Sequence, residues 1–399
     1  MVNIDTCHTN IIDGSLNRNL KNISPSGIRK FFDLLFSTED VVSLSIGEPY
    51  FITPRHIRDA ATSSLEKGYT MYTSNYGMIE LRQEIARHLE ELYQVTYKPE
   101  KEILVTVGTS QGLDIALRAI INPGDEIIIP DPCYVAYSPC IVLAGGVPVP
   151  IPTGRENNFA IKASDIESHI TGKTKAILIG YPSNPTGAVM PVKELSLIVE
   201  LANHYNLLVI SDEIYSRLTY GMKHTCFTSL PGAKDKTILI DGFSKSYAMT
   251  GWRIGYIAAD NKFIEAMTRI HQYTMLCAPI MVQMAAIEAL RHGENDVKMM
   301  VKEYNKRRHI LVDGLNTVGL DCFEPNGAFY AFPSIKNIGM TSEEFCENLL
   351  LEEKVAVIPG SAFGSCGEGF VRCSYATPLN NIEEALNRID SFVSKRKRR

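Results

Sequence analysis

Short apolar runs alternate with helical patterns through the middle of the chain. The runs are rich in Ile, Leu and Val and lack a polar face, which is typical of strands covered on both sides by helices. They lie at Ile103–Val107, Glu126–Ile129, Ala176–Gly180, Leu207–Ser211, Thr237–Asp241 and Ile254–Ala258. The periodic stretches between them predict helices, among them Gln111–Ile121, Val192–Tyr205 and Lys262–Met275. This alternation predicts an α/β domain with a mostly parallel sheet.

The C-terminal part of the chain has a different pattern. It predicts a long helix over about Asn295–Thr317, a strand near Ala328–Phe332, a helix near Ser342–Glu353, a strand near Val355–Ile358 and a final helix from Asn381. This order indicates a separate, smaller α+β domain. The N-terminal segment contains no strand–helix unit, so we expect it to pack against that smaller domain.

Composition excludes several classes of protein. The 399 residues carry 40 Lys and Arg against 45 Asp and Glu, and this net charge of −5 argues against a nucleic-acid-binding protein. No apolar run approaches the roughly 18 residues of a membrane span, and the N-terminus lacks the features of a signal peptide. Nine cysteines without a CxxC motif indicate reduced thiols in the cytoplasm. Their spacing to the histidines indicates no metal site. The basic tail Lys395–Arg399 is expected to be a frayed, solvated terminus.

The strand at Thr237–Asp241 is followed by Ser244 and Lys245, with Arg253 eight residues further on. A lysine at the end of a buried strand is poorly solvated, which lowers its pKa and makes its amine nucleophilic. Such an amine can form a Schiff base with an aldehyde cofactor, and a nearby guanidinium suits a phosphate group. On this segment alone, a surface lysine in a polar turn is an equal alternative.

Two neighbouring strands also end in polar side chains. Asp212 and Tyr215 follow the strand Leu207–Ser211, and Asn184 follows Ala176–Gly180. Taken singly, Asp212 is as readily a helix cap and Asn184 a turn residue. Because the carboxyl ends of parallel strands share one edge of a sheet, a single pocket can collect these groups with Lys245.

Together these motifs resemble the fold type I pyridoxal-5′-phosphate enzymes, and more narrowly the prokaryotic class I/II aminotransferases of the aspartate/aromatic group. The matching motifs are, in order, Asn184-Pro-Thr-Gly, Asp212-x-x-Tyr215, Ser244-Lys245 and Arg253. The resemblance runs from about Ser43 to the last helix. It implies an aspartate-aminotransferase-like fold. It further implies a large cofactor-binding domain over residues 50–289 and a small domain made of residues 1–49 and 290–399.

The resemblance also implies a role for each site residue. Lys245 would bind the cofactor and act as the catalytic base, Asp212 would pair with the pyridine nitrogen, and Tyr215 and Asn184 would contact the ring hydroxyl. The other cofactor-binding residues would be Gly108, Thr109, Ser110, Tyr134, Ser244, Arg253 and, across a homodimer interface, Tyr72. The substrate would be bound by Gly47, Asn184 and Arg372.

The implied reaction is transfer of the amino group of an L-amino acid to a 2-oxo acid such as 2-oxoglutarate. The donor would be aromatic, aspartate-like or N-acetyl-diaminopimelate-like. A pyridoxal-phosphate-dependent C–S lyase of the same fold is the nearest alternative.

A different class of enzyme is suggested by Gly108-Thr109-Ser110-Gln111-Gly112, which spells the GxSxG nucleophile elbow of an α/β-hydrolase with Ser110 as nucleophile. Such an enzyme needs a histidine after a strand. The candidates His271, His292 and His309 all fall in helical patterns. The hydrolase interpretation also leaves Lys245 and Asp212 without a role, so we favour the aminotransferase.

Overall fold

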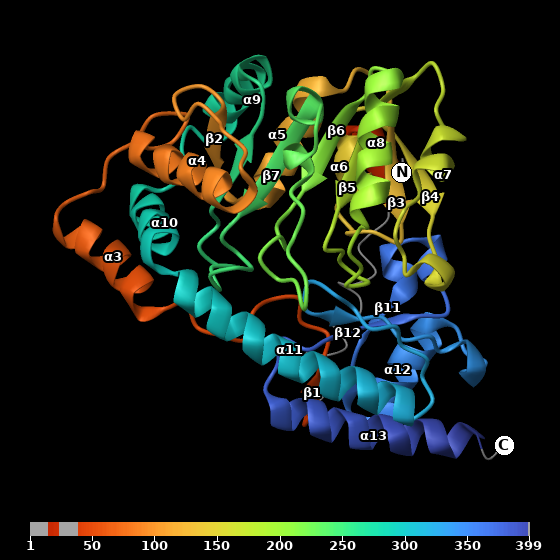
Figure 1. The fold of residues 1–399 in the computed structure, drawn as a ribbon. Coiled ribbons are helices and arrows are strands. Elements are labelled where there is room, and N and C mark those ends of the chain that lie inside the picture. The colour runs from red at the N-terminus through yellow and green to blue at the C-terminus, as the bar shows by residue number, and fades with distance from the viewer. Residues whose placement is uncertain (1–14, 24–38, 398–399) are drawn as a thin grey trace, which may run out of the picture.

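The centre of the molecule is a seven-stranded sheet in the computed structural model, which describes residues 15–23 and 39–397 (Figure 1). The strand order is β2-β8-β7-β6-β5-β3-β4, and within this sheet β8 alone runs antiparallel to its neighbours. The predicted mostly parallel sheet is therefore confirmed. Its strands are β2 (Ile103–Thr106), β3 (Glu126–Asp131), β4 (Val147–Pro152), β5 (Thr174–Gly180), β6 (Leu208–Asp212), β7 (Thr237–Gly242) and β8 (Gly255–Ala258).

Strand β4 was not predicted from the hydrophobic pattern. Its sequence VPVPIP places Pro148, Pro150 and Pro152 in alternate positions. Proline lacks the N–H that a central strand must donate, so it is confined to edge strands and bulges. β4 lies at the edge of the sheet beside β3, where the prolines are tolerated.

Helices cover both faces of the sheet, as the apolar strands predict. Alternate residues of β7 show the two layers: Ile238 and Ile240 pack with α5 and α9, whereas Leu239 packs with α4 and α10. The first layer contains α5 (Gly108–Ile120), α6 (Tyr137–Leu143) and α9 (Asn261–Thr274). The second contains α4 (Ile79–Tyr93), α8 (Val192–His204) and α10 (Ile280–His292), flanked by α3 (Arg55–Glu66) and α7 (Ala163–Glu167).

The C-terminal segment forms a second layered unit below the large sheet (Figure 1). Helices α11 (Glu294–Thr317), α12 (Ser342–Glu353) and α13 (Leu379–Lys397) pack with two small sheets. One sheet pairs β1 (Val42–Ser43) with β10 (Val355–Ala356), and the other has the order β11 (Ile358–Pro359), β12 (Val371–Ser374), β9 (Tyr330–Ala331). None of the helices in the described ranges is long and apolar enough to cross a bilayer.

This unit confirms part of one expectation and corrects another. The parallel pairing of Val42 with Val355 confirms that β1 packs against the C-terminal unit, whereas the short 3-10 helix η1 (Arg18–Asn22) contacts α6 beside the large sheet, so the expectation holds only for the part of the N-terminal segment at β1. The single predicted strand at Val355–Ile358 is wrong. The segment divides into β10 and β11, which belong to different sheets. β10 pairs with β1, and β11 pairs with β12.

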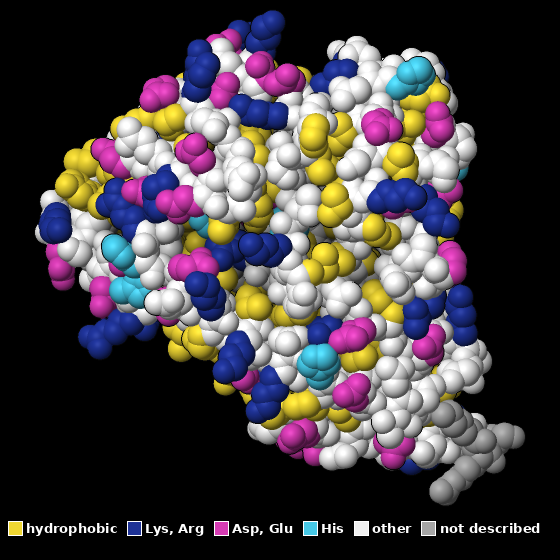
Figure 2. Space-filling view, viewed as in Figure 1, with side chains coloured by type: hydrophobic (Ala, Val, Ile, Leu, Met, Phe, Trp, Pro, Cys, Tyr) yellow, Lys and Arg dark blue, Asp and Glu magenta, His cyan; other side chains and the backbone are white. Residues whose placement is uncertain are grey.

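The surface carries mixed charges, and the basic tail is part of that mixture. On the face shown in Figure 2, basic and acidic side chains are interspersed. Helix α13 continues to Lys397, with the Lys395 Nζ 2.5 Å from Glu353 Oε1 and the Arg396 Nη2 2.6 Å from Glu352 Oε1. The expected frayed tail is therefore wrong for these two residues, because carboxylates on α12 pair with them. Residues 398–399 lie outside the described ranges.

Candidate active site

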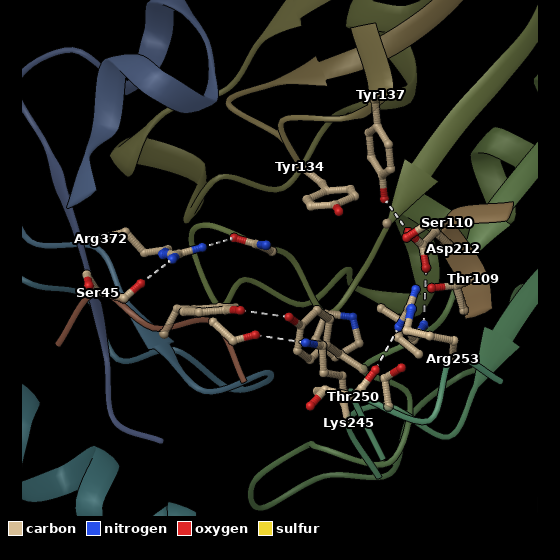
Figure 3. Close-up of a pocket in the computed structure, with 18 residues that line it drawn as sticks. Ser45, Thr109, Ser110, Tyr134, Tyr137, Asp212, Lys245, Thr250, Arg253 and Arg372 are labelled. Atoms are coloured by element: carbon tan, nitrogen blue, oxygen red, sulfur yellow. Dashed lines mark hydrogen bonds between the residues drawn. The ribbon is translucent and has the colours of Figure 1, made fainter. Parts of the chain in front are cut away.

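One pocket of about 380 Å³ lies where β5, β6 and β7 end, and β9 and β12 of the C-terminal unit close its other side (Figure 3). All of the predicted site residues line it except Gly108 and Tyr72. The lining residues are Ser45, Gly47, Thr109, Ser110, Tyr134, Tyr137, Gly180, Pro182, Asn184, Asp212, Ile214, Tyr215, Ser244, Lys245, Thr250, Arg253, Tyr330 and Arg372.

Lys245 projects into this pocket from the loop after β7. Its Nζ donates a hydrogen bond to the backbone oxygen of Gly47, 2.8 Å away (Figure 3). The pKa of Lys245 is lowered to about 8, chiefly by burial and also by Arg372 and Arg253, while Glu48 and Asp212 oppose the shift. The amine is therefore neutral in a substantial fraction of molecules near pH 8, as a nucleophile or base requires.

Asp212 is the last residue of β6, the strand next to β7, and also lines the pocket. Its carboxylate accepts hydrogen bonds from the Tyr137 hydroxyl at 2.9 Å and the Ile214 backbone N–H at 3.2 Å. Burial raises the pKa of Asp212 to about 6, and these two donors oppose the rise. A buried carboxylate of this kind favours a neighbouring cationic N–H group, because the cation offsets the cost of burying the charge.

Tyr215 and Tyr330 meet between the large sheet and the small one. Their hydroxyl oxygens are 2.8 Å apart, and both side chains are buried. Tyr330 also packs its ring against the guanidinium of Arg372, 4.5 Å from the ring centroid. The two phenols therefore present polar oxygens at the centre of the pocket.

Arg372 enters from β12 and is held on several sides. Its Nη1 donates to Asn184 Oδ1 at 2.9 Å and its Nη2 to the Ser45 backbone oxygen at 2.7 Å. The buried Nε has no hydrogen-bond partner among the described residues. Since a buried guanidinium N–H is costly to leave unsatisfied, this arrangement favours an added carboxylate.

The start of α5 forms a cradle for an anion. Gly108 has φ +76°, and a Cβ atom there would lie 2.4 Å from Arg253 Nη2. No side chain caps the helix, so its first N–H groups are free for a ligand. Arg253 is anchored by donation from its Nη1 to the Thr250 backbone oxygen at 2.8 Å. Helix N–H groups facing a guanidinium are suited to a phosphate.

Tyr72 does not reach this pocket, because its side chain is 80% exposed on the surface of the chain. Ser110, the hydrolase candidate, lines the pocket without any histidine among the lining residues of the described chain. The histidines considered for that role lie on α9, α10 and α11, as predicted. The described lining therefore offers Ser110 no histidine to act as the general base of a hydrolase.

Comparison with known proteins decides the family. The sequence model of "Aminotransferase class I and II" matches residues 39–389. The chain belongs to this family. It is 53% identical to the Bacillus subtilis protein YugH over 94% of this chain and 97% of that protein. It is 45% identical to the aspartate aminotransferase of Pyrococcus abyssi over 94% of this chain and 97% of that enzyme. The solved aromatic aminotransferase from Pyrococcus horikoshii matches with a TM-score of 0.88 and 42% identity over 93% of this chain and 99% of that one.

Aminotransferases of this class depend on pyridoxal 5′-phosphate, and the predicted enzyme class, fold and cofactor are confirmed. The pocket fits this cofactor by three observations. The uncapped start of α5 and Arg253 offer donors to a phosphate, Asp212 offers a buried carboxylate to the ring nitrogen, and Tyr215 offers a phenol. The same pocket also contains the Lys245 amine, whose lowered pKa suits it to react with the aldehyde carbon of the cofactor.

Sequence reasoning missed Tyr137 and Tyr330 as site residues. Tyr137 lies in the same aromatic segment as Tyr134, which was predicted, and its hydroxyl reaches Asp212 from the first turn of α6. Tyr330 belongs to the Gly327-Ala328-Phe329-Tyr330 segment of the C-terminal unit. These segments carry the signal, but only tertiary contacts show which of their side chains enter the pocket.

Proposed function

We propose that this aminotransferase moves the amino group of an aromatic or acidic L-amino acid to 2-oxoglutarate. The observation that carries the proposal is one pocket containing both an amine of lowered pKa, Lys245, and a buried guanidinium, Arg372. The relatives support the substrate class, since one is an aspartate aminotransferase and another an aromatic aminotransferase. An N-acetyl-diaminopimelate-like donor belongs to the same proposal.

Lys245 would bind the cofactor and then move protons. When bound, pyridoxal 5′-phosphate supplies an electron sink for the carbon that loses its proton. The neutral Lys245 amine would take the proton from the α-carbon of the amino acid, and its pKa of about 8 suits that base near neutral pH. Asp212 would hold the ring nitrogen in its protonated form, with Tyr137 fixing the orientation of the carboxylate.

The remaining predicted residues would bind and orient. Tyr215 and Asn184 would contact the ring hydroxyl, and Tyr134 would pack on the ring. The phosphate would be held by the N–H groups of Gly108, Thr109 and Ser110, together with Ser244 and Arg253. Arg372 would bind the substrate α-carboxylate beside the backbone of Gly47.

We further propose a functional homodimer in which Tyr72 of one chain contacts the cofactor phosphate held by the other. Exposure of 80% of a tyrosine side chain supports this role, because tyrosine is enriched at interfaces. We retain the division into a cofactor domain over 50–289 and a small domain from 1–49 and 290–399. The described cysteines are all free, which supports a cytoplasmic location.

A panel of amino donors tests the reaction and the substrate together. Each L-amino acid is supplied with 2-oxoglutarate, and release of the corresponding oxo acid is measured. We expect glutamate and an oxo acid in equal amounts, with aromatic and acidic donors fastest. Pyruvate and ammonia released from cysteine-like substrates, without glutamate, would instead establish the C–S lyase.

A further inference from the structure

Gln111 lies in the first turn of α5 and, unlike Thr109 and Ser110, does not line the pocket. Its Oε1 accepts a hydrogen bond from the Val107 backbone N–H at 2.7 Å. Its Nε2 lies 2.8 Å from Nδ1 of His271, a fully buried side chain on α9. Two side chains therefore connect the last turn of α9 to the backbone just before α5.

The direction of both hydrogen bonds follows from the backbone donor. Because the Val107 N–H can only donate, the amide oxygen of Gln111 must face it, and the amide NH₂ must face His271. His271 Nδ1 must then accept, which places the ring proton on Nε2. That nitrogen is buried and has no partner among the described residues. Burial also lowers the pKa of His271, so the ring is neutral and keeps this tautomer.

The backbone fixed in this way is the turn that shapes the anion cradle. Val107 has ψ 70° and Gly108 has φ +76°, and this sharp change of direction starts the helix at Gly108. Thr106 Oγ1 supports the turn from the strand side by donating to the Gly108 oxygen at 3.0 Å. A carboxylate at position 111 could accept from Val107 as well, but its charge would repel a phosphate. The glutamine–histidine pair holds the turn without adding charge.

We propose that His271 is a positioning residue for the cofactor phosphate, acting through Gln111 on the Val107–Gly108 turn. The proposal rests on the proposed assignment of the α5 N-terminus to that phosphate. His271 touches neither cofactor nor substrate, so its replacement changes how tightly the cofactor is held and leaves the chemistry at saturating cofactor unchanged.

The test compares retention of pyridoxal 5′-phosphate by the full-length enzyme after dilution. In His271→Phe the Gln111 amide loses its acceptor, and we expect cofactor affinity to fall about tenfold, the scale of one unsatisfied buried group. The kcat at saturating cofactor should stay within about twofold of wild type. The double variant His271→Phe/Gln111→Met should bind no more weakly than Gln111→Met alone, because both changes break one connected pair.

His56→Phe is the matched control. His56 also lies within hydrogen-bond distance of two side chains, Glu288 at 2.8 Å and Asp296 at 3.1 Å, but on α3 and away from the cradle. It should lose stability without losing cofactor affinity. Wild-type affinity in His271→Phe, or fully additive losses in the double variant, would overturn the proposal.

If His271→Phe folds poorly, a second variant and a second probe still test the proposal. Gln111→Glu keeps an acceptor for Val107 and adds a charge, so both the cofactor and inorganic phosphate should bind about tenfold more weakly than to wild type. Unchanged affinity for both ligands would contradict the proposal. If wild-type enzyme bound the cofactor but inorganic phosphate did not compete at all, the phosphate assignment itself would fail, which is a separate result.

Discussion

Arg372 is a guanidinium prepared for a carboxylate by contacts at Asn184, Ser45 and Tyr330. We predict that Arg372→Ala raises KM for amino acids ten- to a hundredfold, since each charge-assisted hydrogen bond contributes roughly 1.5–3 kcal/mol. The KM for a neutral amine without a carboxylate should change little. Steady-state kinetics with both substrates make the comparison, and equal losses for both would rule out the carboxylate role.

Lys245 is the residue on which the chemistry depends. We predict that Lys245→Ala abolishes turnover, because neither the base nor the covalent attachment can be supplied by another lining side chain of the pocket. The absorbance that the cofactor gains on attachment should also be lost. Lys245→Arg is the matched charge-retaining variant and should be equally inactive. Full activity in a purified Lys245→Ala enzyme would refute the assignment.

Asp212 makes the stability of the cofactor-free enzyme depend on pH. Its pKa is about 6 in the folded protein and near 3.8 when exposed, so the folded state binds more protons between these values. The free energy of unfolding should therefore fall as pH rises from about 4 to about 6, by roughly 1.4 kcal/mol per unit of pKa difference. Urea unfolding of wild type and Asp212→Asn measures this contribution. An identical pH dependence in both proteins would contradict it.

At the scale of elements, the order of strands and helices around the site could be predicted from the sequence. Each type of element has its own spacing of hydrophobic residues, and that spacing can be recognised along the chain. The signal failed where local chemistry competed with it. The prolines of β4 hid an edge strand, and the apolar run at Val355–Ile358 concealed a change of sheet. Tyr137 and Tyr330 were missed for a related reason, since the approach of their side chains to Asp212 and Tyr215 depends on packing between segments far apart in sequence.

The N-terminus of α5 requires a glycine at its first position. We predict that Gly108→Ala lowers cofactor affinity about tenfold or more, because it combines backbone strain at φ +76° with a Cβ only 2.4 Å from Arg253 Nη2. Gly124→Ala is the matched control, with φ +90° and nothing within 4 Å of the added Cβ. It should cost stability alone. Equal cofactor affinities of the two variants, measured by titration, would show that the cradle is not the phosphate site.

At the scale of the whole molecule, segments far apart in the described sequence meet in the C-terminal unit. β1 pairs with β10, and the basic end of α13 pairs with carboxylates of α12. The composition suggested that the basic residues at the C-terminal end form a solvated tail without partners. Counts of charged residues carry no information about which side chains meet in the folded protein. The discontinuous domain arrangement stays a prediction from the family resemblance, because neither the hydrophobic periodicity nor the net charge carries information about it.

The dimer prediction also belongs to this scale. A mixture of Tyr72→Ala and Lys245→Ala chains should recover activity, because a heterodimer places wild-type Tyr72 and wild-type Lys245 at one of its two sites. Each variant alone should be impaired. Activity assays on refolded or co-expressed mixtures, with each variant as its own control, decide the matter. No gain on mixing would mean that Tyr72 does not act across the interface.

The most direct test of the central claim is a single reaction cycle without an oxo-acid acceptor. Holoenzyme is mixed with an excess of an aromatic or acidic L-amino acid, and released oxo acid is counted against active sites. An aminotransferase keeps the amino group, so we predict one oxo acid per site and then no further release until 2-oxoglutarate is added. Continued release of oxo acid together with ammonia, in the absence of any acceptor, would contradict the account.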